Sequence, residues 1–316
     1  MREHLTHAIY YAEVHLIYST IVWLAAWALT SVPGGSASTK HWIWFATALN
    51  FILPLGAVFD GLLAPHILWA TPLAAVGELG ASISENTRIA TALGVVWLIG
   101  AIAMLARLCA RIASEHRSDQ ASDQAAVAES GRITHQGFHA DGVAVRFGDA
   151  RRGPAVNGLL RSHISLPVGI DLLLSERELN SVLMHELTHA RRHDNLLRLI
   201  FEISLCALWF HPLVWITGSR VALYRELSCD ETVIQRGHGR ELVSALAKLA
   251  NCGEGQLLQA TATSFLSHRL AQLSGARFSQ MNIATSAILY LCFALVFAAG
   301  VFATVAHTAC CFIART

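Results

Sequence analysis

Twelve residues near the middle of the chain, LMHELTHARRHD from Leu183 to Asp194, contain side chains that bind metals. His185 and His189 are four residues apart, and Glu186 directly follows the first of them. On an α-helix, residues four apart lie on one face, so both imidazoles can bind the same ion. This H-E-x-x-H pattern is typical of zinc peptidases, in which the glutamate accepts a proton from the attacking water. The stretch therefore predicts two zinc ligands, His185 and His189, and a general base, Glu186.

The third ligand must come from another part of the chain. The metzincin pattern would place a glycine and a histidine where this chain has Arg192 and Asn195, so that pattern is absent. His193 extends the four-residue spacing, but an unbroken helix would place it a full turn beyond the ion. We therefore expect His193 to lie at the surface or beside a ligand, without binding the metal.

The sequence YRELSCDE, from Tyr224 to Glu231, offers a better third ligand. Glu226 and Asp230 are four residues apart on a second predicted helix. In glutamate-type zinc sites a glutamate from a second helix completes the ligand set, and a carboxylate accepts the other N–H of a ligand histidine. Glu226 is thus the predicted third ligand and Asp230 the predicted partner of a histidine. We expect the Cys229 thiol to point away from their face.

Turn and capping signals predict the elements that must hold these residues. Ser175 and Glu178 form an S-x-x-E capping box, which predicts that a helix begins there and continues into the histidine motif. Upstream, alternating apolar residues predict a short strand that ends at Pro167. We expect the segment from Leu159 to Leu166 to present backbone groups to an extended peptide.

The composition indicates a membrane protein. Of the 316 residues, 54% are hydrophobic and 14% charged, and the mean hydropathy is +0.46. The net charge is +1 and no dense stripe of Lys or Arg occurs, which argues against a direct nucleic-acid partner. Four stretches approach the roughly 20 apolar residues that a membrane-spanning helix needs. They cover residues 8–32, 41–63, 89–111 and about 285–307, the last within a C-terminal segment of residues 284–316.

The arginines predict the orientation of these spans. The loop from Ala64 to Thr87 holds no Lys or Arg, whereas Arg107, Arg111 and Arg117 follow the third span. The positive-inside rule then places the N-terminus outside and residues 113–283 in the cytoplasm. We therefore predict three spans in residues 1–112, followed by a cytoplasmic catalytic domain and a fourth span.

An apolar run over residues 195–217 separates the two helices that carry the motifs. A single crossing of the membrane would put Glu226 on the side opposite His185 and His189, and two crossings do not fit in so short a segment. We expect a membrane-embedded or interfacial hairpin that bends near Pro212. The alternative is a pair of helices buried in a soluble core.

Several segments together resemble one known family. HELTHARRHDNL, WFHPLVW and YRELSCDETV are similar to the BlaR/MecR-type membrane metallopeptidases, which transduce antibiotic signals to a cytoplasmic repressor. GPAVNG and ISLP, ahead of the histidine motif, resemble the substrate-side strand of that family. The resemblance is close from Gly153 to Val233, and the pattern of spans extends it to nearly the whole chain.

The resemblance implies the same site as the residues themselves. His185, His189 and Glu226 would bind Zn²⁺, Glu186 would be the general base, and Asp230 would hold a histidine. The implied fold is a mainly α membrane protein with four transmembrane helices. A cytoplasmic α+β zinc peptidase domain of gluzincin type is inserted between the third and fourth spans.

One departure from the family concerns the signal. Its receptors carry a penicillin-binding sensor after the fourth span, whereas no S-x-x-K acyl-serine motif follows that span before Thr316. We therefore expect a signal to enter through the spans, through the Ala64–Thr87 loop or through a partner. The expected partners are the lipid bilayer, a protein or peptide substrate such as a winged-helix transcriptional repressor, and, where the protein dimerises, a second copy.

The function predicted from the sequence is a regulatory zinc endopeptidase of the bacterial cytoplasmic membrane, with its active site facing the cytoplasm. It would cleave a cytoplasmic repressor or its own chain. Two alternatives remain open: a housekeeping quality-control protease of the HtpX type, and a non-catalytic membrane signal transducer. The group that stabilises the oxyanion is also open, with His163, Tyr224 and Arg225 as candidates.

Overall fold

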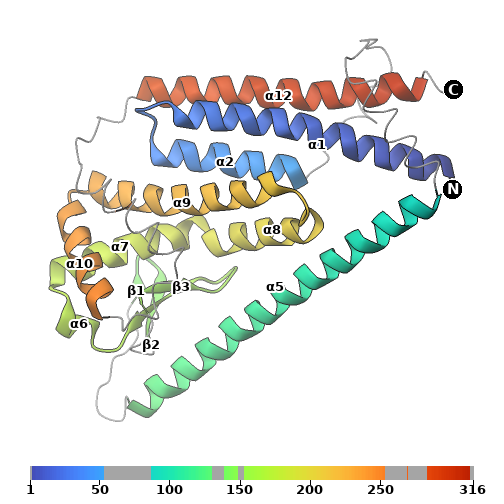
Figure 1. The fold of residues 1–316 in the computed structure, drawn as a ribbon. Coiled ribbons are helices and arrows are strands. Elements are labelled where there is room, and N and C mark those ends of the chain that lie inside the picture. The colour runs from blue at the N-terminus through green and yellow to red at the C-terminus, as the bar shows by residue number, and fades with distance from the viewer. Residues whose placement is uncertain are drawn as a thin grey trace. The chain divides into compact units, whose positions relative to one another are not determined.

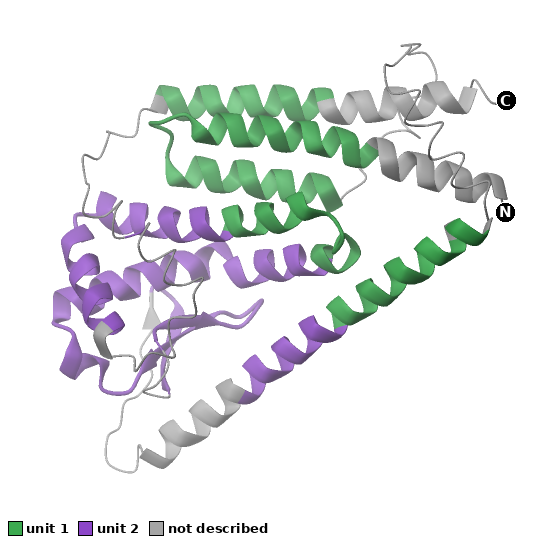
Figure 2. Cartoon of the chain, in the orientation of Figure 1, with its two compact units in different colours: residues 1–105, 204–221, 281–316 green, residues 106–203, 222–280 purple. Residues whose placement is uncertain are grey.

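The computed structural model describes residues 2–52, 87–129, 139–148, 153–252, 269 and 283–313. In this part of the chain the protein is mainly helical and contains one small sheet (Figure 1). The chain divides into two compact units (Figure 2). Unit 1 comprises residues 1–105, 204–221 and 281–316, and unit 2 comprises residues 106–203 and 222–280.

Three long helices pack together in unit 1: α1 (Arg2–Ser31), α2 (Ala37–Ile52) and α12 (Ile283–Ile313) (Figure 1). Their contacts include polar groups as well as apolar ones. Asn50 donates to the Ser19 hydroxyl at 3.0 Å, and the Trp44 indole donates to the Thr30 hydroxyl at 3.2 Å. These bonds satisfy polar groups that would be costly to leave unpaired between apolar helices.

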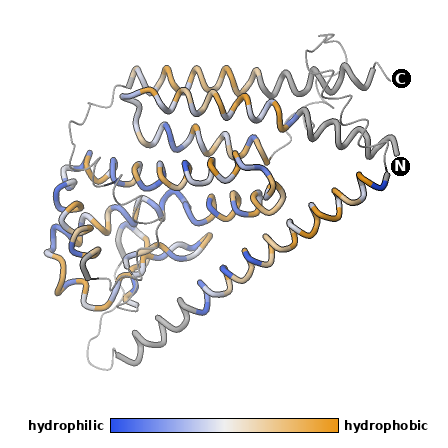
Figure 3. Tube along the Cα trace, viewed as in Figure 1, coloured by the Kyte–Doolittle hydropathy of each residue, from blue (hydrophilic) through white to orange (hydrophobic). Residues whose placement is uncertain are grey.

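Helix α5 (Thr87–Glu129) is the clearest candidate for a membrane span. Within the described ranges, Thr91–Arg117 is the one helical segment that is long and apolar enough to cross a membrane, with a mean hydropathy of 2.1. Its hydrophobic part gives way to hydrophilic residues along the helix (Figure 3). His15–Ser31 and Ala284–Ala299 are shorter apolar helices, so the four-span arrangement stays a prediction. The end of the predicted second span and the loop up to residue 86 lie outside the described residues.

The bend predicted near Pro212 is confirmed. Helix α8 (Asp194–Ala207) ends before it, and helix α9 (Pro212–Gln235) begins at the proline itself, a position where the missing N–H costs nothing. In unit 1 the bend lies against α5. The Trp97 indole donates to the Ala207 carbonyl at 2.8 Å, and the Trp209 indole donates to the Trp97 carbonyl at 3.2 Å. A Cβ at Gly100 would lie 2.1 Å from the Trp209 ring, so this approach requires glycine.

Large apolar side chains on the hairpin are exposed. Ile203, Phe210 and Ile216 have 54%, 48% and 43% of their surface accessible. This exposure disagrees with a helical pair buried in a soluble core and favours contact with lipid or another apolar partner.

A four-stranded sheet in unit 2 precedes the histidine motif. Its order is β1 (His139–Ala140), β2 (Val143–Gly148), β4 (His163–Pro167), β3 (Ala155–Asn157). The strand predicted to end at Pro167 is confirmed as β4. It pairs in parallel with β2 and antiparallel with β3, so both of its edges are occupied and β3 is an edge strand.

The sheet packs against α7 (Glu176–Arg192), which in turn packs against α10 (Gly239–Cys252). The short helix α6 (Ile170–Leu173) leads from the sheet into α7. The core between these elements is apolar and fully buried, and includes Val145, Ile164 and Leu242. Packing against a sheet and a second helix fixes the face of α7 that carries the histidines.

The capping box predicted at the start of α7 is confirmed. The Ser175 hydroxyl accepts from the Glu178 amide, and the Glu178 carboxylate accepts from the Ser175 amide at 2.8 Å. The same carboxylate accepts from Lys248 at 2.7 Å and pairs with Ser244, both on α10. Glu178 thus joins the beginning of α7, which carries the histidine motif, to its packing partner α10.

Replacing Glu178 should change how stability depends on pH. The bonds from Lys248 and Ser244 hold the pKa of Glu178 at about 2, below its ordinary value of 4.5. Because the folded pKa is lowered, this stabilisation is present above pH 4.5 and is lost as the pH falls towards 2. Glu178→Gln should lower the unfolding temperature at pH 7. Between pH 5 and pH 3 the unfolding temperature of the variant should fall less than that of the wild type. Thermal unfolding in detergent measures both, with the exposed Asp171→Asn as control; parallel pH profiles for wild type and Glu178→Gln would contradict this role.

Candidate metal centre

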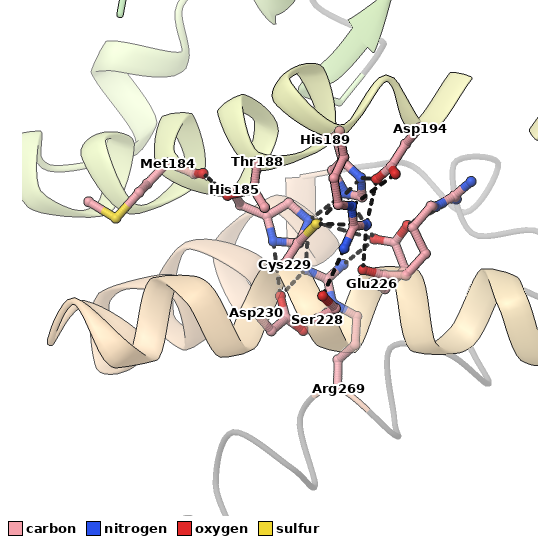
Figure 4. A network of polar contacts seen from close by, with 12 residues as sticks. Met184, His185, Thr188, His189, Asp194, Glu226, Ser228, Cys229, Asp230 and Arg269 are labelled. Atoms are coloured by element: carbon pink, nitrogen blue, oxygen red, sulfur yellow. Dashed lines mark hydrogen bonds and ion pairs between the residues drawn. The ribbon is translucent and has the colours of Figure 1, made fainter. Parts of the chain in front are cut away.

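The three predicted ligands converge on one point. His185 and His189, on α7, place their Nε2 atoms 3.1 Å apart. Glu226, on α9, places Oε2 at 3.6 Å from the first of these atoms and 3.7 Å from the second. Figure 4 shows the two imidazoles directed towards α9 and the carboxylate of Glu226. These side chains form a group that could hold a metal ion.

The spacing fits zinc. A tetrahedral ion with bonds of 2.0–2.2 Å holds its ligand atoms about 3.3 Å apart, close to the separations found here. Each ring has its other nitrogen at a carboxylate: His185 Nδ1 lies 3.0 Å from Asp230, and His189 Nδ1 lies 2.6 Å from Asp194. When Nδ1 donates to a carboxylate, the neutral ring leaves the Nε2 lone pair as an acceptor. Two such nitrogens facing each other at 3.1 Å can share a proton or bind a metal ion, and two imidazoles with a carboxylate suit zinc.

The charges around the ligands also favour a cation. Burial lowers the pKa of His185, but the neighbouring carboxylates of Asp230 and Glu226 together outweigh burial and raise the pKa to about 9. For His189 burial is again the largest single effect, but Glu226, Cys229 and Asp194 together outweigh it, and the pKa lies well above its ordinary value. Burial raises the pKa of Glu226, yet both histidines together hold it well below its ordinary value. The site therefore holds positive charge either as protons on the imidazoles or as a metal.

Asp194 is a residue of the site that the sequence reasoning missed. Helix α7 ends at Arg192, and His193 adopts a left-handed conformation with φ of 54°. This residue is exposed and binds none of the ligands, as expected, but the helix is not continuous through it. The break turns the chain so that Asp194, the first residue of α8, reaches back to His189. An aspartate at a helix start is the one signal that could have located it.

The expectation for Cys229 is wrong. Its thiol is fully buried beside the site, and its Sγ lies 3.5 Å from Nδ1 of His189. This is the ring atom that faces Asp194, so the thiol does not join the group around Nε2. Nearby, Arg225 pairs with Oε1 of Glu226 at 3.0 Å and leaves Oε2 facing the histidines.

A cavity of about 320 Å³ opens at this point in unit 2. Glu186 lines it together with the three predicted ligands, so the predicted base and ligands share one space. One wall comes from Pro154, Ala155 and Val156 at strand β3, and another from apolar residues of α10 (Leu242, Leu246 and Leu249). A peptide in extended conformation would meet an edge strand and an apolar surface there.

This wall corrects the predicted substrate segment. The segment from Leu159 to Leu166 was expected to face the peptide, but β4 occupies much of it and lies inside the sheet. Strand β3, immediately before it, lies at the edge of the described sheet and lines the cavity, and its Val156 carbonyl accepts from the Asn195 side chain at 2.8 Å. Alternation of apolar residues reports the faces of a strand and not which strand lies at the edge.

Comparison with known proteins identifies the family. A model of the BlaR1 peptidase M56 family matches residues 14–273, most of the chain. The chain belongs to the M56 peptidases. This family is one of metallopeptidases, in agreement with the resemblance seen in the sequence, and the metal it implies fits the three converging side chains.

Two M56 relatives are informative. The Regulatory protein BlaR1 of Bacillus licheniformis is 25% identical over 235 residues, which cover 69% of this chain and 37% of that protein. The Methicillin resistance mecR1 protein of Staphylococcus aureus is 24% identical over 98 residues, or 31% of this chain and 17% of that protein. The chain thus spans little more than a third of the length of the first relative.

Zinc binding to this site should depend strongly on pH. The pKa of His185 is raised to about 9 and that of His189 is also raised, so without metal the imidazoles hold protons that zinc must displace. As the pH rises, this competition weakens. The zinc association constant should increase roughly 10- to 100-fold per pH unit between about pH 6.5 and 8.5. Titration against a chelator of known affinity measures it, and a constant affinity over this range would be inconsistent with two protonated ligands.

Substitutions at the site should weaken zinc binding in a graded manner. Glu226→Ala removes a ligand and should abolish stoichiometric zinc after dialysis. Asp194→Asn leaves all three ligands but loses the charge that holds His189, and should lower zinc affinity by about 10- to 100-fold. Zinc content is measured by metal analysis of purified protein. Asp141→Asn, at an exposed ion pair with Arg191, is the control. Wild-type zinc content in Glu226→Ala would exclude Glu226 as a ligand.

Proposed function

We propose that this protein is an integral membrane zinc endopeptidase that, in response to a signal, cleaves a cytoplasmic repressor or its own chain. The observation that carries the proposal is the convergence of His185, His189 and Glu226 beside Glu186 in one cavity. Membership of the M56 peptidase family supports metal-dependent hydrolysis of a peptide bond.

The residues of the cavity suit that chemistry. Zinc bound by the three side chains would supply a Lewis acid that polarises a peptide carbonyl and acidifies water. Glu186 would accept a proton from water as its oxygen attacks the carbonyl carbon, and would pass that proton to the departing amide nitrogen. The edge of β3 would hold the peptide in extended form, with the leucines of α10 against its side chains.

A regulatory role at the membrane rests on separate observations. The apolar helix Thr91–Arg117 supports insertion in a bilayer, and Arg107, Arg111 and Arg117 favour a cytoplasmic end after it. The relative in Bacillus licheniformis carries the name of a regulatory protein, and the staphylococcal relatives that of methicillin resistance. That the substrate is a repressor is part of this proposal, and the names of these relatives are what supports it.

Glu186→Ala should separate metal binding from catalysis. The variant keeps all three ligands, so it should retain about one zinc per chain. Without the base it should lose cleavage by at least ~100-fold, because a positioned proton acceptor contributes about 10²–10⁴ to the rate. A library of quenched fluorescent peptides, incubated with the full chain in detergent, reports cleavage.

The exposed Glu176→Ala, on the first turn of the same helix, is the matched control and should behave as wild type. Wild-type protein that purifies without stoichiometric zinc, or that cleaves as fast after Glu186→Ala, would overturn the proposed function.

A further inference from the structure

Peptide hydrolysis needs a donor for the negative charge that develops on the carbonyl oxygen. The sequence offered three candidates for it. Neither His163 nor Tyr224 is among the described residues that line the cavity. Arg225 does line it, but its Nε and Nη2 bind Oε1 of Glu226 at 3.2 and 3.0 Å, the oxygen that does not face the histidines. The donor has to be sought elsewhere.

Two arginines of the site hold the aspartates that orient the histidines. Arg192 donates to Asp194 from Nε at 3.0 Å and from Nη2 at 2.6 Å. Arg269 donates to Asp230 in the same way, from Nε and Nη2, both at 2.8 Å. Each forms a two-pronged pair that fixes the plane of the guanidinium. The site thus contains two equivalent chains of imidazole, aspartate and arginine.

The two arginines differ in their remaining nitrogen. Nη1 of Arg192 donates to the Ser228 hydroxyl at 2.7 Å, so that arginine is engaged on all sides by α8 and α9. Nη1 of Arg269 lies 3.6 Å from Oε2 of Glu226, beyond hydrogen-bonding distance. That oxygen is the atom facing both histidines.

Arg269 therefore turns a donor edge towards the point where the three ligand atoms converge. It lines the cavity, and only 13% of its side chain is exposed. Its Nη2 lies 3.5 Å from Nε2 of His185. Figure 4 shows it entering the site from a segment other than α7 and α9, next to Asp230. Such a donor, held before substrate arrives, needs no reorganisation during the reaction.

We propose that Arg269 is a catalytic residue whose Nη1 edge hydrogen-bonds the carbonyl oxygen of the scissile peptide as that oxygen becomes an anion. This inference rests on the proposed function. Water oxygen bonds to the carbonyl carbon, the C=O π pair moves onto the oxygen, and Glu186 takes the proton. Collapse re-forms C=O and breaks C–N, and the proton goes to nitrogen. Arg269 transfers no proton and gains strength as a donor only while the oxygen is charged.

The test compares an oxyanion mimic with a plain zinc ligand. The probe is the phosphinate analogue of the peptide that the wild type cleaves best, since its tetrahedral P–O⁻ imitates the charged oxygen. Acetohydroxamate binds zinc without that geometry. Arg269→Gln should keep zinc and hydroxamate affinity, while kcat falls about 100-fold, KM changes little, and the phosphinate Ki rises by a similar factor.

Two further variants keep the proposal falsifiable. Arg269→Lys can pair with Asp230 but cannot also present a second donor edge, so it should retain zinc and still bind phosphinate weakly. Arg192→Gln should weaken the binding of zinc and of both inhibitors to a similar extent. Arg191→Gln, outside the cavity, should match wild type.

Two results would overturn the role of Arg269. One is that both Arg269 variants lose affinity for phosphinate and hydroxamate equally, or lose zinc. Either result would make Arg269 a positioning residue for the metal. The other is wild-type phosphinate binding by zinc-loaded Arg269→Lys. A wild-type chain that holds zinc but cleaves no peptide in the library would instead refute the proposed function itself.

Discussion

Two imidazole nitrogens that face each other at 3.1 Å constrain the rest of the site and the helices that carry it. Buried aspartates lie beside the opposite nitrogens of His185 and His189, and either a proton or a metal ion between the rings removes the repulsion of two lone pairs. This geometry needs a regular helix for the two histidines and a second helix for Glu226 and Asp230. It also needs the histidine helix to end soon after His189, so that Asp194 can reach that ring. Unit 2 meets these demands with the capped start of α7, its packing against the sheet and α10, and the turn after Arg192.

The break at His193 shows how a local backbone choice completes the site. In a continuing helix Asp194 would lie five residues after His189, about 140° around the axis from it. The left-handed residue breaks the helix at this point, and the Asp194 carboxylate comes to 2.6 Å from Nδ1 of His189. Arg192, the last residue of the helix, then holds the same carboxylate and reaches Ser228 on α9. One turn thus orients a ligand and joins the two helices that carry the site.

The sequence predicted the parts of the site that obey local rules. The capping box and the four-residue spacings on α7 and α9 each depend on a single helix, and the structure brings those residues together. Asp194 was missed because the break at His193 is not encoded by a glycine, and Arg269 because 39 residues separate it from Asp230. The edge strand was misplaced since alternation does not report strand neighbours. Hydropathy likewise gives the length of an apolar helix, but does not show whether its exposed face contacts lipid or another protein segment.

The charges explain how an arginine can stand beside a metal. Each aspartate of the site is paired with a guanidinium through two short bonds, so the pairs Asp194–Arg192 and Asp230–Arg269 add no net charge. A divalent cation would be balanced by Glu226 and Glu186, with Arg225 in excess. These groups would therefore leave the cavity with a net positive charge, which favours an oxygen that is gaining negative charge. An arginine that binds its aspartate with one edge can donate to that oxygen with the other edge. Because the aspartate already neutralises the guanidinium, the arginine adds little repulsion towards the metal ion.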